Sequence, residues 1–266
     1  MENYTISRQL IVATSELEKA GVDTPRLDAE VLLAYVLNVR RLALYINMEK
    51  NLKDEQVARY RNLIRGRMDR VPVAYLTGHK EFMGLNFAVT PDVLIPRPET
   101  EILVQGVIEH MQEFNHDLKL ADIGAGSGAI CISILKFVDN ATAAAVDISK
   151  NAIDVAQFNA AKFHVDDRIN FYEGNLFEPL EGQTFDIIIS NPPYITAEEF
   201  KTLQPEIETE PHIALDGGAD GLNFYRKIID DAPKFLNAGG LLAFEIGMNQ
   251  AAAVQAGVSF IPRKLK

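Results

Sequence analysis

The spacing of apolar residues divides the chain into two parts with different patterns. In the first eighty residues, apolar positions recur at intervals of three and four, which predicts amphipathic helices. The clearest helix start is Thr24-Pro25, where a capping threonine precedes a proline at the first helical position. Further helices are expected over 6–20, 41–47 and 54–69. We therefore predict a small all-helical domain over residues 1–80.

The pattern changes to short alternating runs between residues 81 and 98. Alternation lies on both sides of the turn-forming triplet Thr90-Pro91-Asp92, which predicts a β-hairpin between two domains. Pro96 and Pro98 then enclose Arg97 in an extended segment, before a helix expected near Thr100. We assign residues 81–98 to a β-hairpin linker and residues 99–266 to a second domain.

Strand-like and helix-like segments alternate from residue 118 onward. Strands are expected over 118–123, 142–146, 169–173, 185–190 and 241–246, with helices over 129–138, 150–163 and 222–236 between them. Such alternation is typical of an α/β fold, in which parallel strands are joined by right-handed crossovers and helices cover both faces of the sheet. Ligands of these sheets bind beyond the carboxyl ends of the strands.

Charge separates the same two parts. The chain carries 26 basic and 37 acidic residues, a net charge of −11. Residues 1–85 have a net charge of +2 and the remainder −13, so the second part repels polyanions such as DNA. The exception is a run of five arginines within residues 59–70, which we interpret as a solvated helix face in preference to a docking patch.

Other compositional features limit the class of protein further. Cys131 is the single cysteine, and no stretch resembles a signal peptide or an apolar run long enough to cross a membrane. We therefore expect a cytoplasmic protein without a disulfide. The five histidines are scattered along the chain, so no metal site is expected either.

A glycine-rich loop follows the first strand of the second part. Its residues, which open directly into a helix, are Gly124, Ala125, Gly126, Ser127 and Gly128. Glycines at alternate positions permit a tight turn and let a ligand approach the backbone. The spacing differs from that of dinucleotide-binding loops, which disfavours a pyrophosphate at this position. The alternative is a glycine-rich turn without a ligand.

Two later strand ends carry polar residues that fit a nucleoside. Asp147 ends the second strand about 20 residues after the loop, the interval at which an acidic residue binds ribose hydroxyls, although it could instead cap the helix near Ser149. Asn175 and Leu176 follow the third strand, where they would contact an adenine. Leu176 and its neighbour Phe177 could equally be core residues.

The most specific motif follows the fourth strand. Asn191, Pro192, Pro193 and Tyr194 form a rigid corner, because each proline fixes the backbone and removes a donor. The side-chain oxygen of Asn191 and the carbonyl of Pro192 can each accept one N–H of a planar substrate amide or amine, and Tyr194 can pack on its plane. The alternative is an ordinary Pro-Pro turn.

Together these motifs resemble class I S-adenosylmethionine-dependent methyltransferases that modify planar nitrogens. The segment Ile95-Pro96-Arg97-Pro98-Glu99-Thr100-Glu101 and the helical first part are similar to release-factor glutamine methyltransferases in particular, the HemK family. The resemblance covers residues 5 to about 247. It implies that the helical domain over residues 1–80 recognises the substrate. It also implies a Rossmann-like domain that transfers a methyl group to the glutamine N5 in the Gly-Gly-Gln motif of peptide chain release factors.

The resemblance also implies roles for the motif residues. Gly124 to Gly128, Asp147, Asn175, Leu176 and Asn191 would bind S-adenosylmethionine. Asn191, Pro192, Pro193 and Tyr194 would bind the glutamine, with Arg97 as a further substrate contact. Asn191, Pro192 and Tyr194 would act in catalysis, the product would be S-adenosylhomocysteine, and no metal would take part. We expect a monomer that binds neither DNA nor membranes.

Three other functions are consistent with parts of the pattern. A ribosomal-protein glutamine would need the same site, and a DNA adenine would need it together with a target-recognition domain. A nucleotide-binding module without catalysis would keep the glycine loop but has no use for the Asn191 corner.

The sheet of the family normally continues beyond Gly247, and 19 residues follow here. We expect a short helix over 249–256, at most one strand over 258–261, and an incomplete edge of the sheet.

Overall fold

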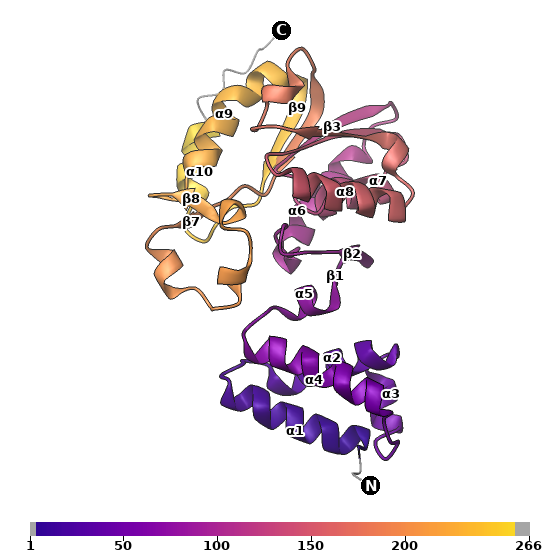
Figure 1. The fold of residues 1–266 in the computed structure, drawn as a ribbon. Helices are drawn as coiled ribbons and strands as arrows, with labels where there is room; N and C mark the ends of the chain where they lie inside the picture. The colour runs from indigo at the N-terminus through magenta and orange to yellow at the C-terminus, as the bar shows by residue number, and fades with distance from the viewer. Residues whose placement is uncertain (1–3, 259–266) are drawn as a thin grey trace. The chain divides into compact units, whose positions relative to one another are not determined.

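A computed structural model describes residues 4–258 of the chain. The chain forms two compact units, which are joined between Gly78 and His79. Figure 1 shows helices alone in the first unit, and strands flanked by helices in the second. The predicted fold class, a Rossmann-like α/β domain preceded by a helical domain and a β-hairpin, is confirmed by this element order.

The first unit is built from amphipathic helices around one apolar core. Its helices are α1 (Ile6–Lys19), α2 (Pro25–Leu37), α3 (Leu42–Ile46), α4 (Asp54–Met68) and α5 (Val73–Thr77). Thr5 caps α1, because its side-chain oxygen accepts a hydrogen bond from the Arg8 amide at 3.3 Å. Tyr60 is buried in the core and donates its hydroxyl hydrogen to the Ala29 carbonyl at 3.0 Å, which connects α4 to α2.

The arginine run on α4 is only partly a solvated face, contrary to the sequence-based interpretation. Arg59, Arg61 and Arg65 are exposed. Arg67 is buried, and its Nε donates to Oδ2 of Asp28 at 2.7 Å. Arg70 donates to the Gly21 carbonyl. The reason is helical geometry: position 67 lies three residues from Ile64 and therefore on the buried side of α4.

The β-hairpin forms earlier in the chain than the sequence pattern indicated. Its strands are β1 (His79–Phe82) and β2 (Leu85–Ala88), and the turn is Met83-Gly84. Both turn residues have positive φ, 52° and 71°, which matches the right-handed twist of a two-residue hairpin. The segment after Thr90-Pro91-Asp92 forms no strand, because the Ile95 amide instead donates to the Glu210 carboxylate at 3.0 Å.

The second unit contains a five-stranded parallel sheet in the order β5-β4-β3-β6-β9. Its strands are β3 (Leu118–Ile123), β4 (Ala141–Asp147), β5 (Ile169–Glu173), β6 (Phe185–Ser190) and β9 (Leu236–Phe244). The helices are α6 (Pro98–Met111), α7 (Ala129–Phe137), α8 (Lys150–Lys162), α9 (Asn223–Phe235) and α10 (Ala251–Val258). A small parallel pair, β7 (Ile195–Thr196) and β8 (Asp216–Gly218), lies in the long connection after β6.

Alternate residues of each strand enter cores on opposite faces of the sheet. Leu120 and Ile187 pack with the apolar faces of α6, α7 and α8. Ala121 and Ile188 pack on the other side with Ile228 of α9. This period of two is the geometry of a pleated strand, and it buries the sheet on both faces. Because all five strands are parallel, their carboxyl ends lie at the same edge of the sheet, and the predicted site residues lie at that edge.

The end of the described chain is helical. The predicted helix over 249–256 is present as α10, but most of the strand predicted over 258–261 lies outside the described residues. Across residues 4–258, no helix combines the length and the apolar character needed to span a bilayer.

Candidate active site

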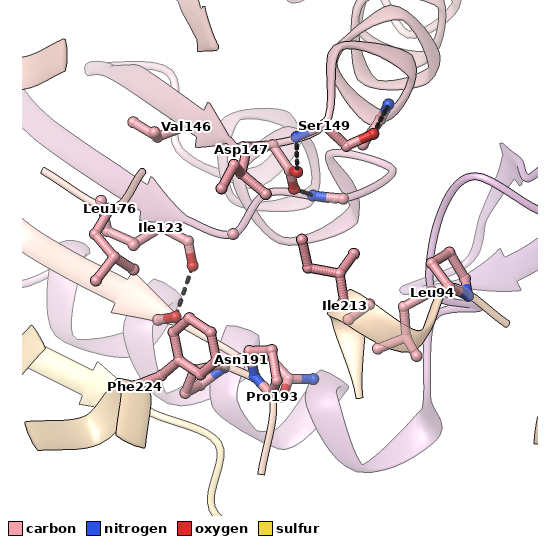
Figure 2. A pocket seen from close by; sticks show the side chains of 18 of the residues that line it. Leu94, Ile123, Val146, Asp147, Ser149, Leu176, Asn191, Pro193, Ile213 and Phe224 are labelled. Carbon is pink, nitrogen blue, oxygen red and sulfur yellow. Dashed lines mark hydrogen bonds between the residues drawn. The ribbon is translucent and has the colours of Figure 1, made fainter. Parts of the chain in front are cut away.

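A cavity lies beyond the carboxyl ends of the parallel strands. Residues from four of the strand ends line it: Gly124 and Gly126 after β3, Asp147 on β4, Asn175 and Leu176 after β5, and Asn191, Pro192 and Pro193 after β6. In the view of Figure 2, Asp147 and Ser149 lie above the cavity, Asn191, Pro193 and Phe224 below it, and Leu94 and Ile213 to the right. We call it the larger cavity.

The loop after β3 approaches the larger cavity with its backbone. Gly126 has φ of 54°, and a Cβ built on it would meet no atom within 4 Å, so the space beside it is open. Gly128 has a different role, since a Cβ there would lie 2.7 Å from the Ile132 side chain and 3.2 Å from Ala156. Gly126 therefore leaves room for a ligand, whereas Gly128 lets α7 and α8 pack closely. Ala125 and Ser127 are buried and do not line the cavity.

Asp147 connects this loop to the start of α8. Its Oδ2 accepts a hydrogen bond from the Gly126 amide at 2.8 Å, and its Oδ1 accepts one from the Ser149 amide at 2.9 Å. Burial raises the pKa of the carboxyl, although these N–H donors act against the rise. Ser149 itself caps α8 by accepting from the Ala152 amide. Each Asp147 oxygen keeps a second lone pair for a ligand hydroxyl at the cavity wall.

The residues after β5 divide between the cavity and the core. Asn175 and Leu176 line the larger cavity, and the Asn175 side chain donates to Glu178 at 3.1 Å. Leu176 has a positive φ of 53°, a left-handed conformation that is uncommon for leucine. Phe177 is 3% exposed and stacks on Phe235 of α9, with ring centroids 4.7 Å apart. Phe177 is therefore a core residue and does not cover a ligand.

The corner after β6 separates two cavities. Asn191 and Pro192 line the larger cavity and also a smaller cavity, whose other lining residues include Arg97, Tyr194 and Glu245. The Asn191 amide nitrogen donates to the Thr100 hydroxyl at 3.2 Å. The Tyr194 hydroxyl lies 3.5 Å from Glu245, and burial raises the pKa of that tyrosine. Asn191 therefore borders both cavities.

Comparison with known proteins places these observations in a family. The PrmC N-terminal domain model matches residues 9–78, and the methyltransferase small domain model matches residues 99–253. The chain is 44% identical to the release factor glutamine methyltransferase of Geobacter sulfurreducens, over 95% of this chain and 88% of that protein. It is 42% identical to the protein of that name from Clostridium acetobutylicum, over 94% and 88%. The chain belongs to the release factor glutamine methyltransferase family.

The family assignment confirms the resemblance that the motifs indicated, and it makes the chain an S-adenosylmethionine-dependent methyltransferase. A solved structure of the hMettl16 catalytic domain, in complex with the MAT2A 3′UTR hairpin 6, has a TM-score of 0.53 and 18% identity. It covers 80% of this chain and 75% of that one. At that identity the likeness shows the fold alone.

The methyltransferase contains an ion pair at the smaller cavity that the sequence pattern did not indicate. The Arg97 Nη2 lies 2.5 Å from Glu210 Oε1, and Glu210 is 6% exposed. Glu198, Glu199 and Glu208 of the same connection are exposed, so Glu210 differs from them in being covered by the fold. Its second oxygen accepts from the Ile95 amide, so one buried carboxylate holds the segment before α6 against the connection that follows β7.

Several residues of the candidate site were not predicted from the sequence. Leu94, Ile213, Phe224 and Lys227 line the larger cavity but lie in segments without a motif. Thr100 and Glu245 contact the Asn191 corner from α6 and from the end of β9. Glu245 follows an apolar strand at the same edge of the sheet as Asn191, and that position was the one signal available. Within residues 4–258 no cluster of His, Cys, Asp and Glu is arranged to hold a metal ion.

A buried acid lies beneath the glycine loop of the methyltransferase. Asp122 is 0% exposed, its Oδ2 accepts from the Cys131 amide at 3.1 Å, and its Oδ1 has no hydrogen-bond partner among the described residues. Burial raises the pKa of Asp122 from 3.8 to about 6, and the neighbouring Asp147 carboxylate adds to the rise. The folded state therefore binds a proton more tightly than the unfolded chain does.

This raised pKa predicts a pH-dependent contribution to stability. Because the folded pKa exceeds the unfolded one, the contribution of Asp122 to the free energy of unfolding rises as pH falls through about 6. Between pH 7 and pH 5 the gain is about 1 kcal/mol. Chemical denaturation of wild type and Asp122→Asn at both pH values should show that the variant loses this gain. The exposed variant Asp167→Asn should keep it, and an unchanged slope in Asp122→Asn would contradict the assignment.

Proposed function

We propose that this methyltransferase transfers a methyl group to N5 of the glutamine in the Gly-Gly-Gln motif of peptide chain release factors. The observation that carries the proposal is the position of Asn191 and Pro192, which line both cavities. The relatives from Geobacter sulfurreducens and Clostridium acetobutylicum, which are named for this activity, support the choice of substrate. One cavity would hold the methyl donor and the other the glutamine side chain.

The larger cavity fits S-adenosylmethionine. Open space beside Gly124 and Gly126 allows a ligand to contact the loop backbone, and the Asp147 carboxylate at the wall can accept ribose hydroxyls. Asn175 and Leu176 would contact the adenine. When bound, the cofactor supplies a methyl group on a positively charged sulfur, and S-adenosylhomocysteine is the product. No residue pattern of the site calls for a metal.

The Asn191 corner would prepare the glutamine for transfer. An amide nitrogen is a weak nucleophile because its lone pair is delocalised into the carbonyl. The Asn191 side-chain oxygen and the Pro192 carbonyl would each accept one N–H, which orients the nitrogen and stabilises positive charge that develops on it. Tyr194, at the wall of the smaller cavity, would pack on the amide plane. The extra proton is acidic once the nitrogen carries the methyl group, so no strong base is needed.

The proposals for the partner and the cellular location rest on net charge, on the named relatives and on the single cysteine. The net charge of −13 on the second part favours a protein over a DNA substrate. A ribosomal-protein glutamine would fit the same corner, but the relatives from Geobacter and Clostridium are named for release factors. We further propose that the enzyme acts as a monomer in the cytoplasm, and the free, buried thiol of Cys131 is compatible with a reducing compartment.

A methyl-transfer assay tests the proposed substrate. The enzyme is incubated with methyl-labelled S-adenosylmethionine and, separately, with a release factor, its Gly-Gly-Ala variant, a ribosomal protein fraction and adenine-containing DNA. Label should enter the intact release factor alone, and mass spectrometry should find the methyl group on the glutamine amide. Label that persists in the Gly-Gly-Ala variant would show that another residue is modified, and label in DNA alone would replace the proposed function.

A further inference from the structure

We propose that Thr100 and Glu245 are positioning residues that determine which end of the Asn191 amide faces the substrate. The inference rests on the proposed function, in which the Asn191 oxygen accepts an N–H of the glutamine. Its basis is a chain of hydrogen bonds that joins three elements, α6, the end of β9 and the corner after β6. Thr100 and Asn191 each lie in a segment that carries a sequence motif, but their connection to each other and to Glu245 is visible only in the structure.

The direction of each hydrogen bond follows from the chemistry of Glu245. Burial raises the pKa of the Glu245 carboxyl, but hydrogen bonds with the side chains of Thr100, Asn191 and Tyr194 act against the rise and favour the ionised form. An ionised carboxylate can only accept, so the Thr100 hydroxyl donates its one hydrogen to Glu245 Oε2 at 2.5 Å. The lone pairs of that hydroxyl then accept from the Asn191 amide nitrogen at 3.2 Å. The NH₂ end of Asn191 is thereby directed to Thr100. Its oxygen is left for a donor from outside this chain of bonds, such as the substrate amide.

Burial makes this orientation energetically important. The two ends of an asparagine amide are almost equal in shape, so only hydrogen bonds decide which way it points. Thr100 is 4% exposed, and water therefore cannot readily replace its hydroxyl as the acceptor. Without that acceptor, the NH₂ group keeps only its hydrogen bond to Glu245, and it would turn toward the glutamine in part of the molecules. A donor would then face a donor, and the nitrogen would lose its alignment with the methyl group.

Glu245 is itself fixed from several sides. Its amide donates to the Ser190 carbonyl at 3.1 Å, and its carbonyl accepts from the Tyr225 hydroxyl at 3.0 Å. The Tyr194 hydroxyl lies 3.5 Å from the other carboxylate oxygen. One carboxylate thus contacts Thr100, which orients Asn191, and also Tyr194 of the same corner. This arrangement places Glu245 where it can orient both substrate-binding side chains.

Matched substitutions at position 100 test the proposal. Thr100→Val keeps the shape of the side chain and removes the hydroxyl, whereas Thr100→Ser keeps the hydroxyl. We expect Thr100→Val to lower kcat for release factor by about 10-fold or more, with the Kd for S-adenosylmethionine unchanged. Thr100→Ser should restore kcat to within about 3-fold of wild type. Glu245→Gln, whose amide can also donate to Thr100, should lower kcat in the same way.

The control is Thr142→Val on β4, an exposed threonine outside the site, which should leave kcat unchanged. A Thr100→Val enzyme with the kcat of wild type would overturn the proposal, as would a Thr100→Ser enzyme as slow as Thr100→Val. Hydrogen exchange of the Asn191 side-chain NH₂, measured by NMR, gives a readout without substrate. It should be slow in wild type and Thr100→Ser and fast in Thr100→Val. A wild-type enzyme that shows this protection but does not methylate a release factor would contradict the proposed function and leave the positioning role intact. Equal exchange rates in all three proteins would overturn the positioning role.

Discussion

Replacing Asn191 with alanine is expected to reduce methyl transfer by about 100-fold to 1,000-fold while S-adenosylmethionine still binds. In the proposed mechanism the side chain would supply an acceptor for the glutamine N–H, and this interaction would become stronger as positive charge develops on the nitrogen. Its loss should therefore lower kcat more than it raises KM for the release factor. Steady-state kinetics with varied release factor, together with calorimetric titration of the cofactor, measure the two effects separately.

Asn175→Ala is the matched control, because it truncates the same residue type at another strand end of the larger cavity. This variant is expected to weaken S-adenosylmethionine binding and to leave kcat at saturating cofactor close to wild type. A parallel loss of cofactor affinity in Asn191→Ala would mean that Asn191 belongs to the cofactor site and not to the glutamine site. Full activity of Asn191→Ala would remove the corner from the proposed chemistry.

Gly217→Ala is expected to displace Tyr194 and to cost both stability and activity. A Cβ at position 217 would lie 2.7 Å from the Tyr194 Cα, 2.8 Å from its carbonyl carbon and 2.8 Å from the Gly221 Cα. All three are backbone atoms, which cannot move aside as a flexible side chain can. We expect a loss of about 3 kcal/mol in the free energy of unfolding. The shift of Tyr194 should lower kcat by about 100-fold. Chemical denaturation and the methyl-transfer assay measure these losses.

Gly106→Ala on α6 provides the comparison for this variant. Its added Cβ meets nothing within 4 Å, and alanine favours a helix over glycine, so stability should stay equal or rise by up to about 1 kcal/mol. A Gly217→Ala protein that is as stable and active as Gly106→Ala would show that the β7–β8 region can move without disturbing the corner. Loss of activity with full stability would confine the effect to Tyr194.

The part of the site that the sequence predicted is the part formed at strand ends. Gly124 and Asn191 directly follow a strand, Asp147 ends one, and Asn175 lies two residues after one, and parallel strands bring such positions to one edge of the sheet. Their proximity needs only the correct fold class, which alternation of strands and helices indicated. The motif at Asn191 also identified the family, and the curated relatives confirm it. The individual roles of these residues remain predictions for the experiments above.

The pattern of apolar and polar residues did not predict contacts between distant segments of the chain. Thr100 and Glu245 are 145 residues apart, and Arg97 and Glu210 are 113 apart. Nothing in the local sequence distinguishes Glu210 from the solvated glutamates near it, because burial of a carboxylate depends on which segment covers it. The position of the hairpin turn was predicted wrongly for a different, local reason. Met83 adopts a left-handed conformation that methionine seldom takes, so its side chain gave no turn signal.

The sequence by itself determined the fold class, the family and the four strand ends at the larger cavity, since these follow from periodicity and from short motifs. The tertiary structure alone decided that Arg67 is buried, that Glu210 binds Arg97, and that Thr100 stands between Asn191 and Glu245. The physical reason is the range of the interactions. Hydrophobic period is set by neighbours a few residues away, whereas a hydrogen bond between buried side chains exists only once packing has brought its two partners together and excluded water.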